Sequence, residues 1–284
     1  MITFEEYSKR MREINRMFMD GNPHSCFADY IAEGIVVNYV DNTVSLNDTD
    51  DGVVFLENEH LVYRYKNLKV YSLLKRTPLK NEIGKNIDGN PFTHALKKKY
   101  GWTFKITQAE INKYVKKFLS ACNSLNLHYD IIVSCPSHSD VNKRFMRVLA
   151  KRVHADKIIE DYFKKTEKQY ILDFGRDFEQ IRKDHPDTYE KVEQQIYADI
   201  MKMGKYFEAG KMNKKYLKYI KNIVSLSGKY TEKDALELFG GKRVLVLDDV
   251  LSSGATVSEC VRVIQQYAPT SIDVITLLSK RYKK

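Results

Sequence analysis

Two adjacent carboxylates, Asp248 and Asp249, stand beside a short loop of small and hydroxyl-bearing residues. The unbroken apolar run at residues 244–247 comes directly before them. A run of this kind predicts a buried strand of a parallel sheet, which would end at the two acids. Apolar residues then recur at helical spacing over residues 257–264 and predict a helix. The acids and the loop are therefore expected between the end of a strand and the start of a helix.

The loop has the composition of an anion-binding site. Its members are Ser252, Ser253, Gly254, Ala255 and Thr256. The first N–H groups of a helix lack partners inside the helix and lie at the positive end of its dipole, so a bound phosphate would satisfy them. Two carboxylates would repel that phosphate unless they accept hydrogen bonds from sugar hydroxyls, or hold magnesium, on the same ligand. The residues therefore predict a sugar phosphate as the ligand.

Residues 247–256 resemble the 5-phosphoribosyl-1-pyrophosphate (PRPP) binding motif of type I phosphoribosyltransferases. That motif is an apolar strand, two acids, two mostly apolar residues and then Thr/Ser-Thr/Ser-Gly-x-Thr, and the sequence Leu-Asp-Asp-Val-Leu-Ser-Ser-Gly-Ala-Thr matches it throughout. A buried strand and turn with acidic capping residues is the alternative, but it would not need both the acids and the hydroxyl-rich loop.

The resemblance implies a role for each part of this stretch. Asp248 and Asp249 would be the catalytic residues, which hold the ribose hydroxyls and stabilise positive charge at the anomeric carbon. Residues 252–256 would bind the 5′-phosphate. Mg²⁺ would be the cofactor, bound mainly through the ligand, with Asp248 and Asp249 as the only protein groups that could ligate it directly.

Residues 129–153 predict a second strand, polar loop and helix in turn. The loop is similar to the pyrophosphate loop of the same family, and to the Val-Pro-x-Ser stretch of ComF-type, competence-associated phosphoribosyltransferases. The chain departs from the ComF-type pattern at residues 142–145, where Asn-Lys-Arg-Phe stands in place of Arg-Gly-Phe-Asn. The resemblance implies that pyrophosphate contacts Ser134, Pro136, Ser137 and His138. An ordinary surface histidine is the alternative for His138.

A strand predicted to begin at Lys157 leads to a further feature of this family. Lys165-Thr166 with Gln169 resembles the basic residue, Thr and Gln of the mobile loop in ComF-type proteins. Such a loop closes over the site and keeps water from a reactive sugar cation. The resemblance implies that Lys165 contacts the pyrophosphate, with an exposed charged turn as the alternative.

Composition limits the class of protein. The chain of 284 residues has a net charge of +10, which suits anionic ligands without choosing among nucleotide, pyrophosphate and nucleic acid. No apolar run approaches the roughly 18 residues of a membrane span, and the first residues do not read as a secretory signal. The four cysteines include no Cys-x-x-Cys pair, so neither a zinc site nor a disulfide framework is expected. These features predict a cytoplasmic protein without a membrane partner.

The predicted fold is α/β, a type I phosphoribosyltransferase-like parallel sheet flanked by helices. Both candidate loops would then lie at the carboxyl ends of strands, where such sheets bind ligands. Residues 106–284 are expected to form this core, with a helical insertion at about 175–235. Residues 1–105 would precede it as an N-terminal elaboration of mixed, hood-like structure, with a helix pair over residues 66–100.

The implied function is transfer of a 5-phosphoribosyl group from PRPP to a base or amine, a glycosyl transfer of nucleotide metabolism. Two other classes stay open: the fold could bind PRPP or a nucleotide only as a regulatory ligand, or serve a nucleic-acid-associated module of DNA uptake or phage defence.

The nucleic-acid class has one sequence feature in its favour. Between Lys202 and Lys221 there are seven lysines, four aromatic residues and one acid, which could form a nucleic-acid or partner surface. A solvated helix with its aromatic residues in the core is the alternative. The sequence also leaves a homodimer open.

Overall fold

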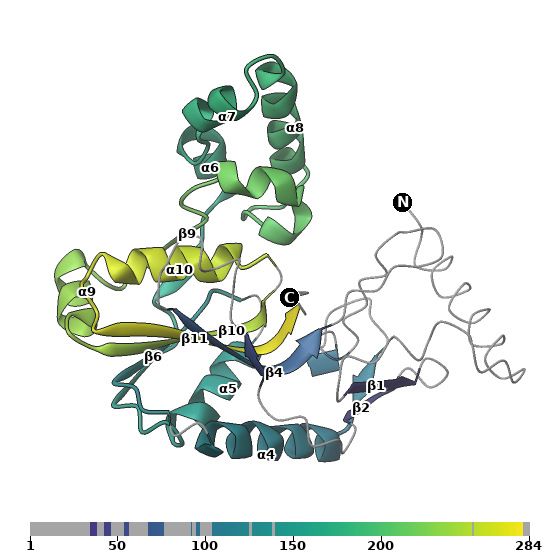
Figure 1. Ribbon diagram of the computed structural model, residues 1–284, viewed down its shortest axis with the longest axis vertical. Coiled ribbons are helices and arrows are strands. Elements are labelled where there is room, and N and C mark those ends of the chain that lie inside the picture. Colours follow the sequence, from purple (N-terminus) through teal and green to yellow (C-terminus); the bar gives the residue numbers. More distant parts are fainter. Residues whose placement is uncertain are drawn as a thin grey trace, which may run out of the picture. The chain divides into compact units, whose positions relative to one another are not determined.

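The architecture of the chain is centred on a six-stranded sheet (Figure 1). The computed structural model describes residues 35–38, 43–46, 54–56, 68–76, 92, 95–96, 104–124, 127–137, 140–251 and 253–280. The strand order is β3-β4-β11-β10-β6-β7. The strands are β3 (Val54–Leu56), β4 (Lys69–Arg76), β6 (Ile131–Ser134), β7 (Lys157–Ile159), β10 (Arg243–Leu251) and β11 (Ser271–Lys280). The pairs β10·β6 and β6·β7 are parallel, and the predicted α/β fold is confirmed.

The chain divides into two compact units. The first contains residues 1–54, 72–125 and 277–284, and the second contains residues 55–71 and 126–276. The second unit includes three helices that pack beside the strands: α5 (Val141–Ala150), α9 (Glu232–Phe239) and α10 (Ala255–Gln265). All the candidate site residues lie in this unit.

β6 and β10 form the middle of the second unit. Their register pairs Val244 with Ile131 and Leu247 with Ser134. Residues 131–133 and 244–247 are all buried, because side chains on both faces of these parallel strands are covered. This burial explains why the sequence reads there as unbroken apolar runs rather than as alternation. The register also brings the carboxyl end of β6 beside the two acids of β10.

β10 is longer than the sequence predicts. The expected strand of residues 244–247 ends at the two acids, whereas β10 continues through both of them to Leu251. Leu251 belongs to the apolar core, and its burial favours extension of the strand beyond the acids. Since successive side chains of a strand point to opposite faces, Asp248 and Asp249 leave the backbone in different directions.

The first unit contains a small sheet and one long helix. The sheet has the order β1-β2-β5, with β1 (Ile35–Asn38), β2 (Thr43–Leu46) and β5 (Lys105–Ile106). The helix α4 (Gln108–Ser124) begins after Thr107, whose Oγ1 accepts the N–H of Glu110 at 3.2 Å. Thr107 is thus an N-cap, as the Thr-Gln-Ala-Glu sequence predicts. Tyr114 is buried on α4 with its ring 4.9 Å from that of Phe92.

The helix pair predicted over residues 66–100 is wrong in its first part. Lys69–Arg76 is the strand β4, and Val70, Tyr71 and Ser72 are buried in succession. Val and Tyr pack well on a pleated sheet surface, and β11 provides the neighbouring strand. Pairing with a strand some 200 residues away outweighs the local helical pattern. Residues 77–91 lie outside the described part of the chain, as do the candidates His138 and Ser252.

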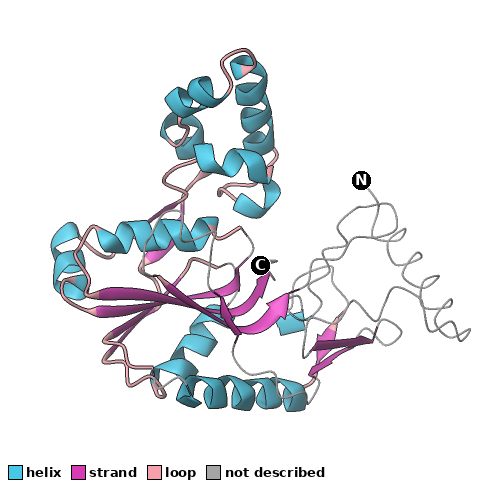
Figure 2. Cartoon of the chain, viewed as in Figure 1, coloured by secondary structure: helices cyan, strands magenta, loops and turns pink. Residues whose placement is uncertain are grey.

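A helical lobe, defined as residues 166–223, extends from a two-stranded ribbon (Figure 2). The ribbon pairs β8 (Phe163–Lys165) with β9 (Val224–Leu226) in antiparallel orientation. The lobe contains α6 (Lys168–Phe174), α7 (Phe178–Asp184), α8 (Tyr189–Met201), η2 (Ala209–Lys211) and η3 (Lys214–Tyr219). Its interior is apolar, with Ile171, Ile181, Ile196 and Tyr219 fully buried. A region that sequence composition describes only as polar and helical therefore has an apolar interior, and these residues belong to the same buried cluster as those of the sheet.

The lysine-rich segment folds differently from the single helix that the sequence suggests. It forms two short 3-10 turns, η2 and η3. Asn213 separates them, because its side chain accepts the N–H of Lys215 at 3.2 Å while its own N–H donates to Asp199 at 3.2 Å. Asn favours such local bonds over a continuing helix. Phe207, Tyr216 and Tyr219 are buried, so the prediction that the aromatic residues lie in the core holds for these three.

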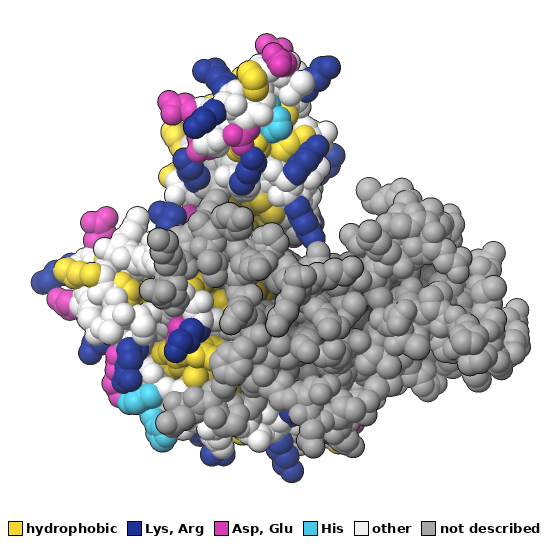
Figure 3. Space-filling model, in the orientation of Figure 1, with side chains coloured by type: hydrophobic (Ala, Val, Ile, Leu, Met, Phe, Trp, Pro, Cys, Tyr) yellow, Lys and Arg dark blue, Asp and Glu magenta, His cyan; other side chains and the backbone are white. Residues whose placement is uncertain are grey.

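Most lysines of this segment contact acids of the lobe. The pairs are Lys202–Asp199 at 3.7 Å, Lys205–Glu167 at 3.1 Å, Lys211–Glu208 at 2.8 Å, Lys221–Asp177 at 2.5 Å, and Lys218–Asp184. Figure 3 shows basic and acidic side chains interspersed over the visible face of the lobe. The high local lysine content is thus largely balanced in space, and nucleic-acid binding by residues 202–221 stays a prediction.

We expect acid to weaken the lobe through Asp184. Its carboxylate accepts bonds from Lys218, from the Tyr219 hydroxyl at 2.9 Å and from Gln180 at 2.6 Å. The Lys218 contact is the main cause that lowers the pKa of Asp184 to about 2. A lowered pKa means that this stabilisation is complete above the ordinary aspartate pKa of about 3.9 and is lost as the pH falls toward 2.

Thermal unfolding of Asp184→Asn measures this effect. The variant should melt below the wild type at pH 7, and the difference should shrink between about pH 4 and pH 2. Asp187→Asn, at an exposed acid of the same lobe, is the control and should match the wild type. Equal melting of Asp184→Asn and wild type at pH 7 would exclude a stabilising role for this carboxylate.

Candidate active site

Asp248 and Asp249 lie near the carboxyl end of β10 and are 9% and 7% exposed. The Oδ1 atom of Asp248 accepts the N–H of Asp249 at 2.9 Å and the side-chain amide of Asn142 at 3.4 Å. The Oδ2 atom of Asp249 accepts the hydroxyl of Ser137 at 3.2 Å. Each acid therefore contacts the segment that follows β6. Two candidate regions more than 100 residues apart in sequence form one site.

The loop after β6 begins as a continuation of the sheet. The N–H of Cys135 donates to the carbonyl of Leu247 at 2.8 Å, and the hydroxyl of Ser134 donates to the carbonyl of Glu160 at 2.9 Å. These bonds join the loop to β10 on one side and to the end of β7 on the other. Pro136 and Ser137 then emerge, partly exposed, toward α5. Of the predicted loop, Ser134 still belongs to β6, and residues 135–137 follow that strand on the way to α5.

Cys135 is a packing residue, not a reactive one. Its side chain is buried and belongs to the apolar core. Burial, with a contribution from neighbouring Cys260, raises the pKa of the Cys135 thiol well above its ordinary value. A buried thiol of this kind is a poor nucleophile because the thiolate is the reactive form.

A cavity of about 240 Å³ opens beside the loop. Ser134, Pro136 and Ser137 line it, and all three belong to the predicted pyrophosphate loop. Lys165 at the end of β8 lines it as well. The structure therefore brings together the four described members of the predicted pyrophosphate group. Asn142, Lys143, Lys164 and Tyr206 also line the cavity.

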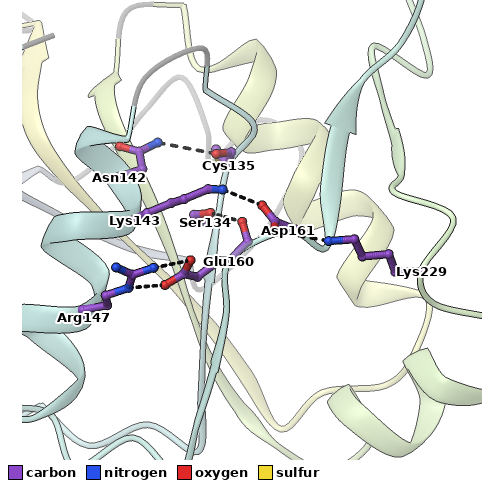
Figure 4. A network of polar contacts seen from close by, with 8 residues as sticks. All are labelled: Ser134, Cys135, Asn142, Lys143, Arg147, Glu160, Asp161 and Lys229. Carbon is purple, nitrogen blue, oxygen red and sulfur yellow. Dashed lines mark hydrogen bonds and ion pairs between the residues drawn. The ribbon is translucent and has the colours of Figure 1, made fainter.

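A network of ion pairs borders this cavity (Figure 4). Lys143 contacts Asp161 at 2.8 Å, and Lys229 contacts the same carboxylate at 3.4 Å. Arg147 binds Glu160 through two bonds of 2.5 and 2.8 Å. The hydrogen bond from Lys143 is the main cause that lowers the pKa of Asp161. These acids follow β7 directly, so the network fixes the end of that strand relative to α5.

The three residues that resemble the mobile loop, Lys165, Thr166 and Gln169, lie in different environments. Lys165 ends the paired strand β8, so this segment is not the exposed charged turn considered from the sequence. Thr166 is buried, and its hydroxyl donates to the carbonyl of Asn222 at 2.6 Å. Gln169 contacts Asp173 on the exposed side of α6 at 3.0 Å. Thr166 joins the two chain segments at the base of the lobe, while Lys165 reaches the cavity.

The predicted phosphate loop, residues 252–256, has a left-handed residue at its middle, and its last two residues open α10. Gly254 has φ of 71° and is the N-cap of α10, where its carbonyl accepts the N–H of Ser258 at 2.8 Å. Glycine adopts this conformation without steric cost. Ser253 is exposed, whereas Ala255 and Thr256 are partly exposed. The first N–H groups of α10 have no partner within the helix, so this end of the helix has the donors that an anion requires.

Sequence reasoning missed three residues of this region, Asn142, Lys164 and Tyr206. Tyr206 lies in the lobe, far in sequence from the loop after β6, and the fold brings it to the wall of the cavity. Lys164 neighbours Lys165 in sequence, which was a usable signal. Asn142 lies in the first turn of α5, directly after the predicted loop, and its position at the start of that helix could have identified it.

Comparison with known proteins agrees with this geometry. The phosphoribosyl transferase domain family matches residues 107–284. The matched part is more than half of the chain and contains β6, α5, β10 and α10 with all the candidate site residues. The chain belongs to the phosphoribosyl transferase domain family. Membership confirms the predicted type I phosphoribosyltransferase relationship, and the ComF-type resemblance stays a prediction.

Two solved structures are similar to this phosphoribosyl transferase domain protein. Both are crystal structures of a hypoxanthine phosphoribosyltransferase from Staphylococcus aureus. The orthorhombic form is 13% identical, with 63% of this chain and 70% of that chain covered at a TM-score of 0.31. The tetragonal form is 14% identical, with 61% and 65% covered at a TM-score of 0.32. A comparison with curated proteins finds no match.

Among the described residues, no helix is long and apolar enough to span a bilayer.

Proposed function

We propose that this protein transfers a 5-phosphoribosyl group from PRPP, with Mg²⁺, to a nitrogen atom of a base or amine and releases pyrophosphate. The observation that carries this proposal is the bond of 3.2 Å between the Ser137 hydroxyl and Asp249. It joins the candidate pyrophosphate loop to the candidate ribose acids. In PRPP the pyrophosphate is bonded to the anomeric carbon of the ribose, next to the ring hydroxyls, so one molecule needs both sites close together.

The donor atoms at the site fit a magnesium-bound ligand. Mg²⁺ is usually held by one or two carboxylates together with substrate phosphates and water. Asp248 and Asp249 supply adjacent, largely buried carboxylates, which would hold the ion when the ligand is bound. Asn142 has a buried amide oxygen, Oδ1, that has no hydrogen-bond partner among the described residues, so it would be available to water on the ion. The ion would neutralise charge on the departing pyrophosphate.

The chain's own residues have distinct proposed roles in the reaction. Asp248 and Asp249 accept the ribose hydroxyls and stabilise positive charge as it develops at the anomeric carbon. The start of α10, with residues 252–256, holds the 5′-phosphate as a remote anchor that orients this carbon. Lys165, across the cavity, contacts the pyrophosphate as it leaves.

Lys165→Met tests the proposed pyrophosphate contact. The methionine keeps most of the side-chain volume but removes the charge. A lost charge-assisted hydrogen bond of about 1.5–3 kcal/mol should raise the KM for PRPP roughly 10- to 100-fold. Steady-state kinetics measures this change, with Lys233→Met at an exposed position of α9 as a control that should match wild type. Unchanged kinetics in Lys165→Met would exclude the contact.

Pyrophosphate release tests the proposed function directly. The protein is incubated with PRPP, Mg²⁺ and a panel of purine bases, pyrimidine bases and simple amines. We expect release that depends on one class of acceptor and stops when Mg²⁺ is chelated. Binding of PRPP without release for every acceptor would instead favour a regulatory ligand site on the same fold.

A further inference from the structure

Asn142 connects the two halves of the site. It is the second residue of α5 and is 1% exposed. Its Nδ2 atom lies 3.4 Å from the carbonyl oxygen of Cys135 and 3.4 Å from Oδ1 of Asp248. One amide group therefore contacts the backbone of the candidate pyrophosphate loop and the side chain of a candidate catalytic acid. Asn142 also lines the cavity.

The orientation of this amide is fixed by its neighbours. Both the Cys135 carbonyl and the Asp248 carboxylate are acceptors, so the NH₂ end of the amide must face them. Rotating the amide by half a turn would place its oxygen against two other oxygens. The Oδ1 atom of Asn142 consequently faces elsewhere, and it is buried without a hydrogen-bond partner in the described part of the chain.

A buried amide oxygen without a partner needs an explanation. Such groups are uncommon in folded proteins, and those that occur often pair with a ligand, an ion or its water. Asn142 adjoins the cavity, the Asp248 carboxylate and the candidate pyrophosphate loop. A ligand that carries a hydrated cation brings O–H donors to this position, and an anion alone does not.

We propose that Asn142 is a positioning residue for Asp248 and also a direct contact for the magnesium–pyrophosphate part of the ligand. Its amide nitrogen holds one carboxylate oxygen of Asp248 in place. Its amide oxygen accepts a hydrogen bond from water bound to the ligand's magnesium. This inference rests on the proposed use of PRPP and assigns a ligand contact to a residue outside both sequence motifs.

Asn142→Leu removes both contacts at nearly constant volume. Calorimetry with magnesium pyrophosphate as the probe, and separately with magnesium PRPP, measures binding without turnover. Loss of a partner that orients a metal-binding group typically weakens metal binding roughly 10- to 100-fold, and we expect a loss in this range for both ligands. Lys151→Gln, at the exposed far end of α5, is the control and should bind as the wild type does.

Asn142→Asp adds a readout that a purely structural role would not change. The introduced carboxyl would face Asp248. The other titratable groups of this region are Asp249, Cys135 and Cys260, and the cavity that residue 142 lines adds Lys143, Glu160, Asp161, Lys164, Lys165 and Tyr206. Burial raises the pKa of both thiols, so they stay neutral in this range. Two adjacent carboxylates share a proton, and the introduced carboxyl, when protonated at low pH, can still donate to Asp248. Binding relative to wild type should be nearly retained at low pH and should fall as pH rises.

The outcomes separate this inference from the proposed function. If the wild type binds and folded Asn142→Leu binds with the same affinity, the role of Asn142 is overturned and the transferase proposal stays intact. Absence of wild-type binding to both magnesium ligands overturns the proposed function together with this inference. If Asn142→Leu does not fold, Asn142→Asp decides, because a pH profile parallel to that of the wild type contradicts the inference.

Discussion

The double substitution Asp248→Asn/Asp249→Asn is expected to lower kcat/KM for PRPP by roughly 1,000-fold or more, since removing one preplaced group that stabilises transition-state charge commonly costs about 100- to 1,000-fold. This variant removes two negative charges beside the proposed position of the anomeric carbon. Both substitutions keep side-chain shape. Asp248 accepts bonds from Asp249 N–H and Asn142 through one oxygen, which an asparagine oxygen can also accept.

The control for this variant is another aspartate of the same sheet. Asp273 on β11 accepts the hydroxyl of Tyr129 at 2.7 Å and the N–H of Lys69 at 3.3 Å. Asp273→Asn should change thermal stability without a comparable change in kcat/KM. Pyrophosphate release under saturating acceptor measures both variants. Retention of more than about a tenth of wild-type activity in the double variant would show that these acids are not the main source of charge stabilisation.

Gly254→Val is expected to weaken PRPP binding about 100-fold or more, because it adds both strain and obstruction at the start of α10. Gly254 has φ of 71°, a conformation that costs an L-residue roughly 1–2 kcal/mol and is an outlier for a β-branched one. Relief of this strain would move the first turn of the helix. The added side chain would also occupy space where backbone N–H groups must approach the 5′-phosphate. Strain and obstruction act on the same loop, so the effect on affinity should be large.

Gly228→Val separates ligand binding from backbone strain. Gly228 also has positive φ, 80°, and an added Cβ there would meet no atom within 4 Å. Both variants should therefore melt below the wild type, while only Gly254→Val should lose affinity for PRPP in a calorimetric titration. Equal affinities in the two variants would contradict the role assigned to the start of α10.

The β10–α10 region could be predicted well because its signal is local. The apolar strand, the acids, the small residues and the helix follow one another without interruption, and each part has its own compositional pattern. The same holds for the β6 loop and α5. The position of both loops at the carboxyl ends of neighbouring parallel strands follows from the general rule for such sheets, and the register of β6 with β10 agrees with it.

Features that depend on distant pairing could not be predicted in this way. The sequence of β4 has a local helical pattern. Its neighbour in the sheet, β11, lies about 200 residues away, so no local signal indicates that the segment is a strand. The bond between Asn142 and Asp248 spans 106 residues, and no local pattern marks it. At residues 165–166, sequence similarity does not reveal that the Thr166 hydroxyl bonds to the Asn222 carbonyl while Lys165 lines the cavity. Lys205, Lys218 and Lys221 of the lobe contact acids that lie more than 30 residues earlier in the chain, so the lysine-rich segment alone does not show that its charge is balanced.

Isothermal titration calorimetry of the wild-type protein with PRPP tests the central claim most directly. We expect saturable binding at one site per chain, with a dissociation constant within the range of about 1 μM to 1 mM that is usual for enzyme substrates. The affinity should fall sharply when Mg²⁺ is omitted and again in Asp248→Asn/Asp249→Asn. No heat of binding at millimolar PRPP with Mg²⁺ present would contradict a PRPP site at β6 and β10, and with it the proposed transferase function.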